Sequence, residues 1–268
     1  MPLNASKVKS ATELAFSPDE VLAAWLAAPL SPPGLREQGV QAVLFDLDGV
    51  LINTAEFHYR AWKQLADDLG IYFDRSINHG FRGVGRSDCL NKLLGEHARD
   101  FADSEKFVLA ERKNAYYLAM VNTLGPRDVL PGARALAMQL KAANIRMALV
   151  SASKNARLVL LKTHMSDWFD AIVDGHDVTK SKPHPECFLK AARVLGVKPA
   201  RCVVIEDAEA GVRAGHAAGC RCIAVGETDA EQYADAAVKS VAEVDVRLIE
   251  EVLAEAKVNR GPRALVRR

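Results

Sequence analysis

Apolar residues along the chain fall into short runs that alternate with longer amphipathic segments. Residues 43–45 are Val-Leu-Phe, and later apolar runs cover 145–150, 171–174, 202–205 and 222–225. Between most of these runs, apolar residues recur every three to four positions, as expected for helices. Strands that alternate with helices are typical of a parallel sheet covered on both faces, so the pattern predicts a doubly wound α/β fold.

The segment between the first two predicted strands is much longer than a simple crossover. Residues 54–70 have an aromatic or apolar residue every fourth position, and helical stretches follow at 86–97 and 104–124. No strong β-like run interrupts them. We therefore expect an all-helical cap domain at residues 55–128, inserted into an α/β core. The expected core consists of residues 39–54 and 129–256, with helices near 133–143, 156–165, 185–195, 209–218 and 246–256.

Both ends of the chain lie outside this alternation. Ser17 followed by Pro18 and Glu20 has the composition of a helix start, so we expect one short helix in an N-terminal extension, residues 1–38. The basic stretch 257–268 is expected to be a disordered, solvated tail.

Polar residues follow four of the predicted strands. Asp46 and Asp48 come directly after the first, and Ser151, Lys182 and the pair Glu206-Asp207 each come after a later one. Because the carboxyl ends of parallel strands share one edge of a sheet, these side chains are expected to converge there. Each has an ordinary structural alternative: an Asp-Gly turn, a surface lysine, or a salt-bridged or helix-capping Glu-Asp pair.

The composition of the chain excludes some classes of binding partner but does not identify a function. The 268 residues are 49% hydrophobic and 26% charged, with a formal net charge of +1. Nucleic-acid and membrane-surface proteins usually need a marked basic excess, so we expect neither kind of partner. Five cysteines and no apparent signal peptide favour a reducing compartment, and we expect a cytoplasmic protein. Cys220 and Cys222 are interpreted as core thiols and not as a metal site.

Six motifs lie within about residues 40–227. They are Phe45-Asp46-Leu47-Asp48-Gly49-Val50, Thr54-Ala55-Glu56-Phe57-His58-Tyr59-Arg60-Ala61-Trp62-Lys63, Gly83-Val84-Gly85-Arg86, Glu111-Arg112-Lys113-Asn114, Ser151-Ala152-Ser153-Lys154-Asn155 and Ser181-Lys182-Pro183. Together these motifs resemble the β-phosphoglucomutases of the haloacid dehalogenase superfamily. The resemblance implies a HAD-like Rossmannoid core with a helical cap.

The resemblance implies catalytic roles for five residues. Asp46 would be the nucleophile that becomes phosphorylated, because a carboxylate attacks phosphorus well when a metal neutralises the charges. Asp48 would be the general acid and base. Ser151 and Lys182 would hold the transferring phosphoryl group, and His58 would link sugar binding and cap closure to Asp48. The implied Mg²⁺ ligands are Asp46, the main-chain carbonyl of Asp48, Glu206 and Asp207.

A second set of residues is implied for substrate binding. Arg86 suits a phosphate that is bound and not transferred, because its planar guanidinium makes bidentate contacts. Lone helical histidines such as His58 are usually structural, and Trp62 has a core alternative. The implied substrate-binding residues are Asp48, Thr54, Trp62, Gly83, Val84, Arg86, Lys113, Ser151, Ala152, Ser153, Lys154 and Asn155.

The implied activity is interconversion of β-D-glucose 1-phosphate and β-D-glucose 6-phosphate through β-glucose 1,6-bisphosphate, by a monomer. A Mg²⁺-dependent sugar-phosphate phosphatase is the alternative on the same fold, and a phosphosugar-binding regulator without turnover is the alternative of another class. Three positions depart from the family pattern and leave the sugar open: Arg82 replaces a lysine, Cys89 replaces a serine, and Gly85 replaces a residue with a side chain.

Overall fold

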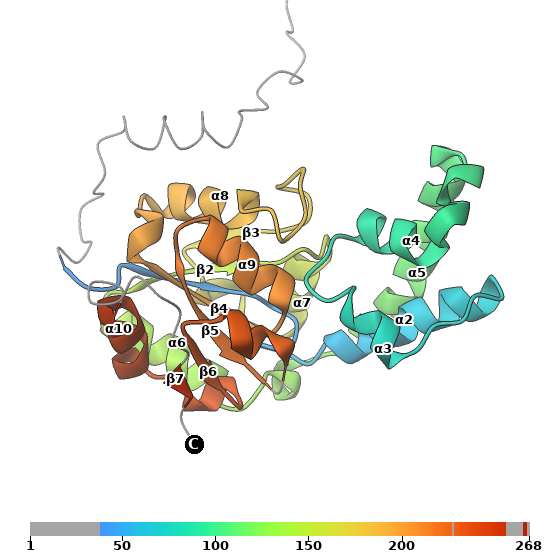
Figure 1. Ribbon diagram of the computed structural model, residues 1–268. Helices are drawn as coiled ribbons and strands as arrows, with labels where there is room; N and C mark the ends of the chain where they lie inside the picture. Colours follow the sequence, from blue (N-terminus) through green and yellow to red (C-terminus); the bar gives the residue numbers. More distant parts are fainter. Residues whose placement is uncertain (1–37, 227, 256–264, 267–268) are drawn as a thin grey trace, which may run out of the picture.

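The computed structural model describes residues 38–226, 228–255 and 265–266, and within them the strands form one parallel sheet (Figure 1). Its order is β3-β2-β1-β4-β5-β6-β7. All neighbouring strands run parallel. The strands are β1 Ala42–Phe45, β2 Arg146–Val150, β3 Ala171–Val173, β4 Cys202–Glu206, β5 Arg221–Val225, β6 Ala236–Val238 and β7 Leu265–Val266.

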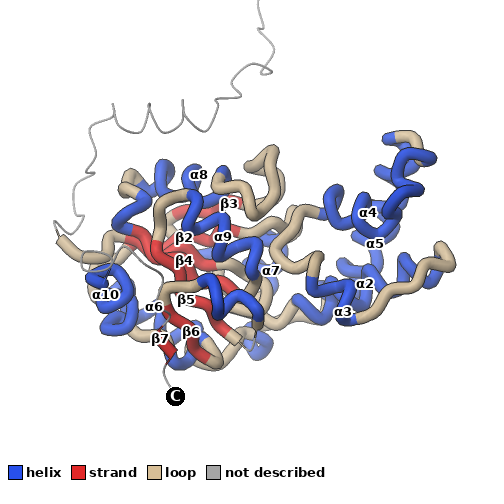
Figure 2. Tube along the Cα trace, in the orientation of Figure 1, coloured by secondary structure: helices blue, strands red, loops and turns tan. Residues whose placement is uncertain are grey.

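Two helical layers cover the sheet because its strands are apolar on both faces (Figure 2). In β1, Val43 and Phe45 face one apolar cluster and Ala42 and Leu44 face the other, as the alternation of side chains along a strand requires. The helices α6 (Ala133–Ala142), α7 (Ala156–Lys162) and α10 (Val246–Glu255) pack on the first face. The helices α8 (Glu186–Leu195) and α9 (Glu209–Ala217) pack on the second.

Four helices between β1 and β2 form a separate group, which we call the cap (Figure 1). They are α2 (Ala55–Asp68), α3 (Arg75–His79), α4 (Arg86–Leu94) and α5 (Asp103–Val121), followed by a 3₁₀ turn at Pro126–Asp128. The cap has an apolar cluster of its own, which includes Trp62, Leu65, Phe73, Phe81 and Leu90. It therefore packs as a unit with its own small core.

The predicted doubly wound sheet with an inserted helical cap is confirmed. The predicted helix at 86–97 ends at Leu94 and continues as a 3₁₀ turn, Gly95–Asp100. The prediction missed α3, β6 and β7, which are only five, three and two residues long. The predicted N-terminal helix lies outside the described residues. Most of the tail does too, although Leu265–Val266, expected to be disordered, pair with β6.

The sheet places a crevice at the carboxyl end of its central strand. The chain passes from β1 to β2 on one side, and β4 lies on the other, so the strand order reverses at β1. Ligands of open α/β sheets bind at such a reversal point. None of the helices in the described part of the chain has the length and hydropathy needed to span a bilayer.

Candidate active site

The turn after β1 places two carboxyl groups at the end of the strand. The Asp46 N–H donates to the Ile205 carbonyl at 3.0 Å, which continues the strand ladder by one residue. The Asp48 N–H donates to Asp46 Oδ2 at 2.9 Å. Gly49 then turns the chain with φ +81°, a conformation that L side chains rarely adopt. The backbone therefore positions the Asp46 carboxylate beyond the sheet edge.

A buried lysine joins this turn to the end of β4. Lys182 Nζ lies 2.6 Å from Asp46 Oδ1 and 2.5 Å from Glu206 Oε1, and it donates to the Val150 carbonyl at 3.2 Å. Burial acts to lower the pKa of Lys182, but the charges of Asp46 and Glu206 outweigh it and raise that pKa above its ordinary value. The ammonium is therefore charged at neutral pH.

Three buried carboxyl groups can offer ligand oxygens to a single ion. One oxygen each of Asp46, Glu206 and Asp207 lie within 4.8 Å of one another. Burial and the nearby Asp46 charge raise the pKa of Glu206 to about 7, and burial raises that of Asp207 well above its usual range. An all-oxygen site with excess negative charge fits a hard divalent cation. The residues present therefore suit a metal ion of this kind.

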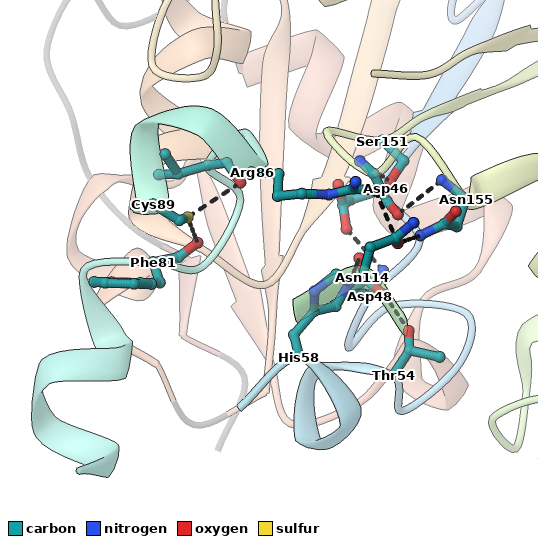
Figure 3. Close-up of polar contacts among 12 residues, drawn as sticks. Asp46, Asp48, Thr54, His58, Phe81, Arg86, Cys89, Asn114, Ser151 and Asn155 are labelled. Carbon is teal, nitrogen blue, oxygen red and sulfur yellow. Dashed lines mark hydrogen bonds and ion pairs between the residues drawn. The ribbon is translucent and has the colours of Figure 1, made fainter. Parts of the chain in front are cut away.

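Asp48 sits in a different environment from Asp46. The Thr54 hydroxyl donates to Asp48 Oδ1, and His58 Nε2 lies 3.7 Å from Asp48 Oδ2 (Figure 3). Burial, with the charge of Asp46, raises the pKa of Asp48 to about 6. A group with such a pKa can both give and accept a proton near neutral pH, as a general acid and base must.

His58 is held by a buried lysine of the cap. Lys113 Nζ lies 2.9 Å from His58 Nδ1, and it also lies over the rings of Trp62 and Tyr117. Burial, together with the charges of Lys113 and Arg86, lowers the pKa of His58 well below its ordinary value, so the imidazole is neutral. When the ammonium donates to Nδ1, the ring proton is on Nε2, the nitrogen nearest Asp48.

A polar bridge joins the cap to the core. Arg86 Nη1 lies 2.5 Å from Glu111 Oε1, and Arg86 Nη2 donates to Asn114 Oδ1 at 2.9 Å. Asn155 Nδ2, from the core, donates to the same Asn114 oxygen at 2.8 Å (Figure 3). A guanidinium and an amide N–H thus converge on one acceptor, an arrangement that can also receive a phosphate oxygen.

These groups line a narrow, partly open cavity of about 70 Å³ between the cap and the core. Pockets for small ligands typically measure about 300–1,000 Å³. This cavity is small for a hexose phosphate, so we expect the cap to move away from the core when the substrate enters. Of the predicted site residues, those in the wall are Asp46, Asp48, His58, Trp62, Gly83, Val84, Arg86, Lys113, Ala152, Ser153, Lys154, Asn155 and Asp207.

Four predicted site residues lie behind the wall instead of in it. Thr54, Ser151, Lys182 and Glu206 are buried and bonded to wall residues or to each other. The structure thus brings the predicted set together, although Thr54 reaches the cavity only through Asp48. Sequence reasoning did not select Asn114, which directly follows Lys113 in a quoted motif. Asn114 contacts residues of α4 and of the loop after β2, and the sequence of its own helix, α5, does not indicate these contacts.

Comparison with known proteins decides the family. A model described as haloacid dehalogenase-like hydrolase matches residues 40–219. A β-phosphoglucomutase of Bacillus subtilis strain 168 is 41% identical over 214 residues, which are 79% of this chain and 95% of that relative. The chain belongs to the β-phosphoglucomutase family. Members of this family are metal-dependent enzymes of the HAD-like type, in agreement with the carboxylate cluster at the end of β1 and β4.

Solved structures agree with that assignment. A β-phosphoglucomutase from Clostridium difficile has a TM-score of 0.78 and 38% identity, with 82% of this chain and 100% of that chain covered. A mutant of CbbY from Rhodobacter sphaeroides, in complex with xylulose-(1,5)bisphosphate, has a TM-score of 0.68 and 27% identity over 79% of this chain and 99% of that chain.

The structure shows what each of the three residues that depart from the β-phosphoglucomutase pattern contacts. Arg82 Nη2 contacts Asp207 Oδ2 at 2.5 Å. The Gly85 N–H donates to Ser181 Oγ at 3.2 Å, and a side chain at position 85 would clash with that oxygen, so glycine permits a close cap–core approach. Burial raises the pKa of the Cys89 thiol to about 12, and its Sγ lies 3.5 Å from the Phe81 carbonyl.

Proposed function

We propose that the protein is a Mg²⁺-dependent β-phosphoglucomutase that interconverts β-D-glucose 1-phosphate and β-D-glucose 6-phosphate. One observation carries the proposal. A single narrow cavity is lined by the Asp46 and Asp48 pair and by a group suited to bind a second anion, Arg86 with Asn155. A bisphosphorylated sugar needs both, since one phosphate reacts while the other is only held.

The first half-reaction uses the pair at the end of β1. Phospho-Asp46 gives its phosphoryl group to the C6 hydroxyl of β-glucose 1-phosphate, and Asp48 accepts the hydroxyl proton. The product is β-glucose 1,6-bisphosphate. Lys182 lies 2.6 Å from the Asp46 carboxylate, so it neutralises the charge that develops on this leaving group as the bond between Asp46 and phosphorus breaks. Bound Mg²⁺ would supply further charge neutralisation and alignment of the phosphoryl oxygens, held by Asp46, the Asp48 carbonyl, Glu206 and Asp207.

The second half-reaction requires the bisphosphate to turn around. Asp46 then attacks the phosphoryl group on C1, and Asp48 returns its proton to the departing sugar oxygen, which gives glucose 6-phosphate and phospho-Asp46. The pKa of Asp48, about 6, lets the same group serve in both directions. His58 Nε2 lies 3.7 Å from Asp48 Oδ2, just beyond hydrogen-bond distance, so a small movement of the cap would let the neutral imidazole donate to that carboxyl.

A sugar-phosphate phosphatase is the second candidate, in which water attacks phospho-Asp46. A relative named validoxylamine A 7'-phosphate phosphatase, from Streptomyces hygroscopicus, is 30% identical over 74% of this chain. The Arg86 and Asn155 bridge favours the mutase, because a phosphatase has no need to retain a second phosphate. A phosphosugar-binding regulator without turnover is disfavoured, because such a protein has no need of the nucleophile Asp46 and the acid Asp48 side by side.

The deciding experiment supplies β- or α-glucose 1-phosphate with Mg²⁺ and a trace of bisphosphate, and measures glucose 6-phosphate and free phosphate together. We expect glucose 6-phosphate from the β anomer, with little free phosphate. Asp46→Asn is expected to abolish it. Asp48→Ala is expected to lower kcat by at least about 10²–10⁴ while binding of phosphate persists. Stoichiometric free phosphate would make the protein a phosphatase, and full activity of Asp46→Asn would overturn the mechanism.

The setting of the enzyme is part of the proposal. Its partner is a small sugar phosphate, and we expect it to act as a monomer in the cytoplasm. All five cysteines are buried free thiols, which supports a reducing compartment. Mass measurement by light scattering, with and without ligand, tests the monomer.

A further inference from the structure

Arg82 reaches from the cap to a carboxylate of the core. Its Nη2 lies 2.5 Å from Asp207 Oδ2, and the two side chains are 28% and 7% exposed. The residues are 125 positions apart in the chain. Asp207 is one of the three acids whose oxygens can share an ion. A cap residue is thus bonded to a member of the proposed metal site.

The Asp207 oxygen that Arg82 contacts lies against the turn after β1. A Cβ at Gly49 would clash with Asp207 Oδ2, so this oxygen lies against the turn that carries Asp46 and Asp48. Mg²⁺ requires near-octahedral oxygen ligands at about 2.0–2.1 Å. A guanidinium hydrogen-bonded to this oxygen uses one of its lone pairs, and its positive charge repels a divalent cation that binds the same oxygen. The two cations therefore compete for Asp207.

Arg82 also separates two spaces. It lines both the narrow cavity of about 70 Å³ and a wider cleft of about 520 Å³. Asp207 and Val84 also line both spaces. Lys182 and Arg213 line the cleft but not the cavity. The Arg82–Asp207 ion pair therefore stands between the cleft and the acids at the end of β1.

We propose that Arg82 and Mg²⁺ bind Asp207 in alternation, so that metal binding releases a contact that holds the cap on the core. The metal reaches Asp207 from the cleft, and the guanidinium moves away as the ion arrives. Because linkage is reciprocal, the ion pair weakens metal binding by the same factor by which metal weakens the ion pair. This inference rests on the proposed metal site and adds a coupling between that site and the cap.

Isothermal titration with Mg²⁺ alone tests the competition. Arg82→Ala is expected to bind Mg²⁺ about three- to tenfold more tightly than the wild type, because a partly buried ion pair no longer has to break. Arg82→Lys keeps the charge and is expected to fall between the two. The matched control is Arg213→Ala, which also removes a positive charge from the cleft. Arg213 pairs with Glu209, so this change leaves Asp207 untouched. It should change the affinity by less than about twofold.

Distance measurement between spin labels tests the coupling. Labels on cysteines introduced at Phe107 of the cap and Met138 of the core suit this purpose, since both positions are exposed and the native cysteines are buried. Mg²⁺ should shift the wild-type distance distribution, and Arg82→Ala should show the shifted distribution without Mg²⁺. Circular dichroism verifies the fold of each variant.

Two failures are distinguishable. Equal or weaker Mg²⁺ affinity of Arg82→Ala, with binding still lost in Asp207→Asn, would overturn the competition and leave the proposed metal site intact. Mg²⁺ binding that persists unchanged in Asp207→Asn, or no binding by the wild type, would overturn the metal site and this inference together.

Discussion

Gly49 is constrained by its own backbone and by a neighbour. Its φ of +81° lies in the left-handed region, and the space where a side chain would begin is taken by the Asp207 carboxylate. Gly70 has a similar φ of +67° but has no heavy atom near the corresponding position. A side chain at Gly70 would therefore meet backbone strain alone, whereas one at Gly49 would meet both backbone strain and a clash with Asp207.

Alanine at each glycine tests this difference. Both Gly49→Ala and Gly70→Ala are expected to lose about 1–2 kcal/mol of unfolding free energy through the left-handed backbone. Gly49→Ala is also expected to displace Asp207 and to lower kcat by at least about tenfold, with weaker Mg²⁺ binding. Urea unfolding and steady-state kinetics measure the two effects. Unchanged kinetics in Gly49→Ala would show that the contact with Asp207 is unimportant.

Individual residues differ in how well the sequence reveals them. Asp46 and Glu206 are predictable because a polar residue at the end of an apolar strand must lie at the sheet edge, whereas Lys182 lies in the loop between β3 and α8. The bonds of Arg82 to Asp207 and of Asn114 to Asn155 join residues 125 and 41 positions apart. No local pattern specifies such pairs, because they depend on how the cap sits on the core.

Between helices α2 and α5, the cap buries a charged side chain. Lys113 on α5 is 2% exposed, and burial lowers its pKa from 10.5 to about 7. The unfolded chain therefore binds more protons than the folded one between about pH 7 and 10.5. The free energy of unfolding accordingly rises with pH through this window.

Replacement of Lys113 by methionine is expected to stabilise the fold and impair the enzyme. At pH 7 or below, Lys113→Met should gain about 2–4 kcal/mol of unfolding free energy, because it removes a charge that folding must desolvate. The gain should vanish above about pH 10.5, where lysine is neutral in both states. Urea unfolding at pH 6.5 and 10.5 measures it, with exposed Lys239→Met as the pH-independent control. A gain of equal size at both pH values would contradict the argument.

Asp235 ties together β5, α9 and the start of β6. Its carboxylate accepts from Arg221 Nη1 at 2.6 Å and from the Cys222 N–H at 2.8 Å, and His216 Nε2 lies 2.9 Å away. Burial acts to raise the pKa of Asp235, but the bonds from His216 and Cys222 outweigh it and the pKa is lowered. The stabilisation is therefore present above the unfolded pKa of about 3.9 and is lost as pH falls through the lower folded value.

Asp235→Asn is expected to cost about 1–3 kcal/mol at pH 7, since charged hydrogen bonds are lost without a change of shape. The deficit relative to the wild type should shrink as the pH falls below about 4. Thermal unfolding at pH 7 and pH 3.5 measures it, and exposed Asp167→Asn serves as the control. A deficit that does not depend on pH would show that the carboxylate charge is not the stabilising feature.

Secondary structure was predictable where the pattern was long. The strands β1, β2, β4 and β5 each have four or five mostly apolar residues and were found from sequence. β6 is as short as β3, but its Ala-Ala-Val run has one β-branched residue where β3 has two, and it forms a strand because β5 offers an open edge. Its assignment therefore needs the tertiary structure.

The whole molecule is expected to open and close at the contact between cap and core. The cavity of about 70 Å³ is small for a hexose phosphate, and the Gly85 N–H of the cap donates to Ser181 Oγ of the core. A Cβ at Gly85 would lie 3.6 Å from Ser181 Cβ, within the range of about 3.5–4.5 Å that a disulfide requires.

Gly85→Cys with Ser181→Cys should therefore lock the cap shut on oxidation. We expect turnover to fall to near zero in the oxidised double variant and to return with a reductant, because substrate cannot enter. Each single variant should be insensitive to oxidant, since the native cysteines are buried. Full turnover of a cross-linked enzyme, verified by mass spectrometry, would show that substrate enters without cap movement.

The placement of the cap after β1 has a consequence for how such enzymes diversify. The nucleophile, the acid and the buried lysine belong to the sheet and its loops, whereas α2 to α5 form one uninterrupted stretch of chain between two strands. Exchange of that stretch with the equivalent segment of another gene would leave every strand pairing of the sheet in place. A lineage can thus acquire a new substrate through one recombination event and inherit its phosphoryl chemistry unaltered.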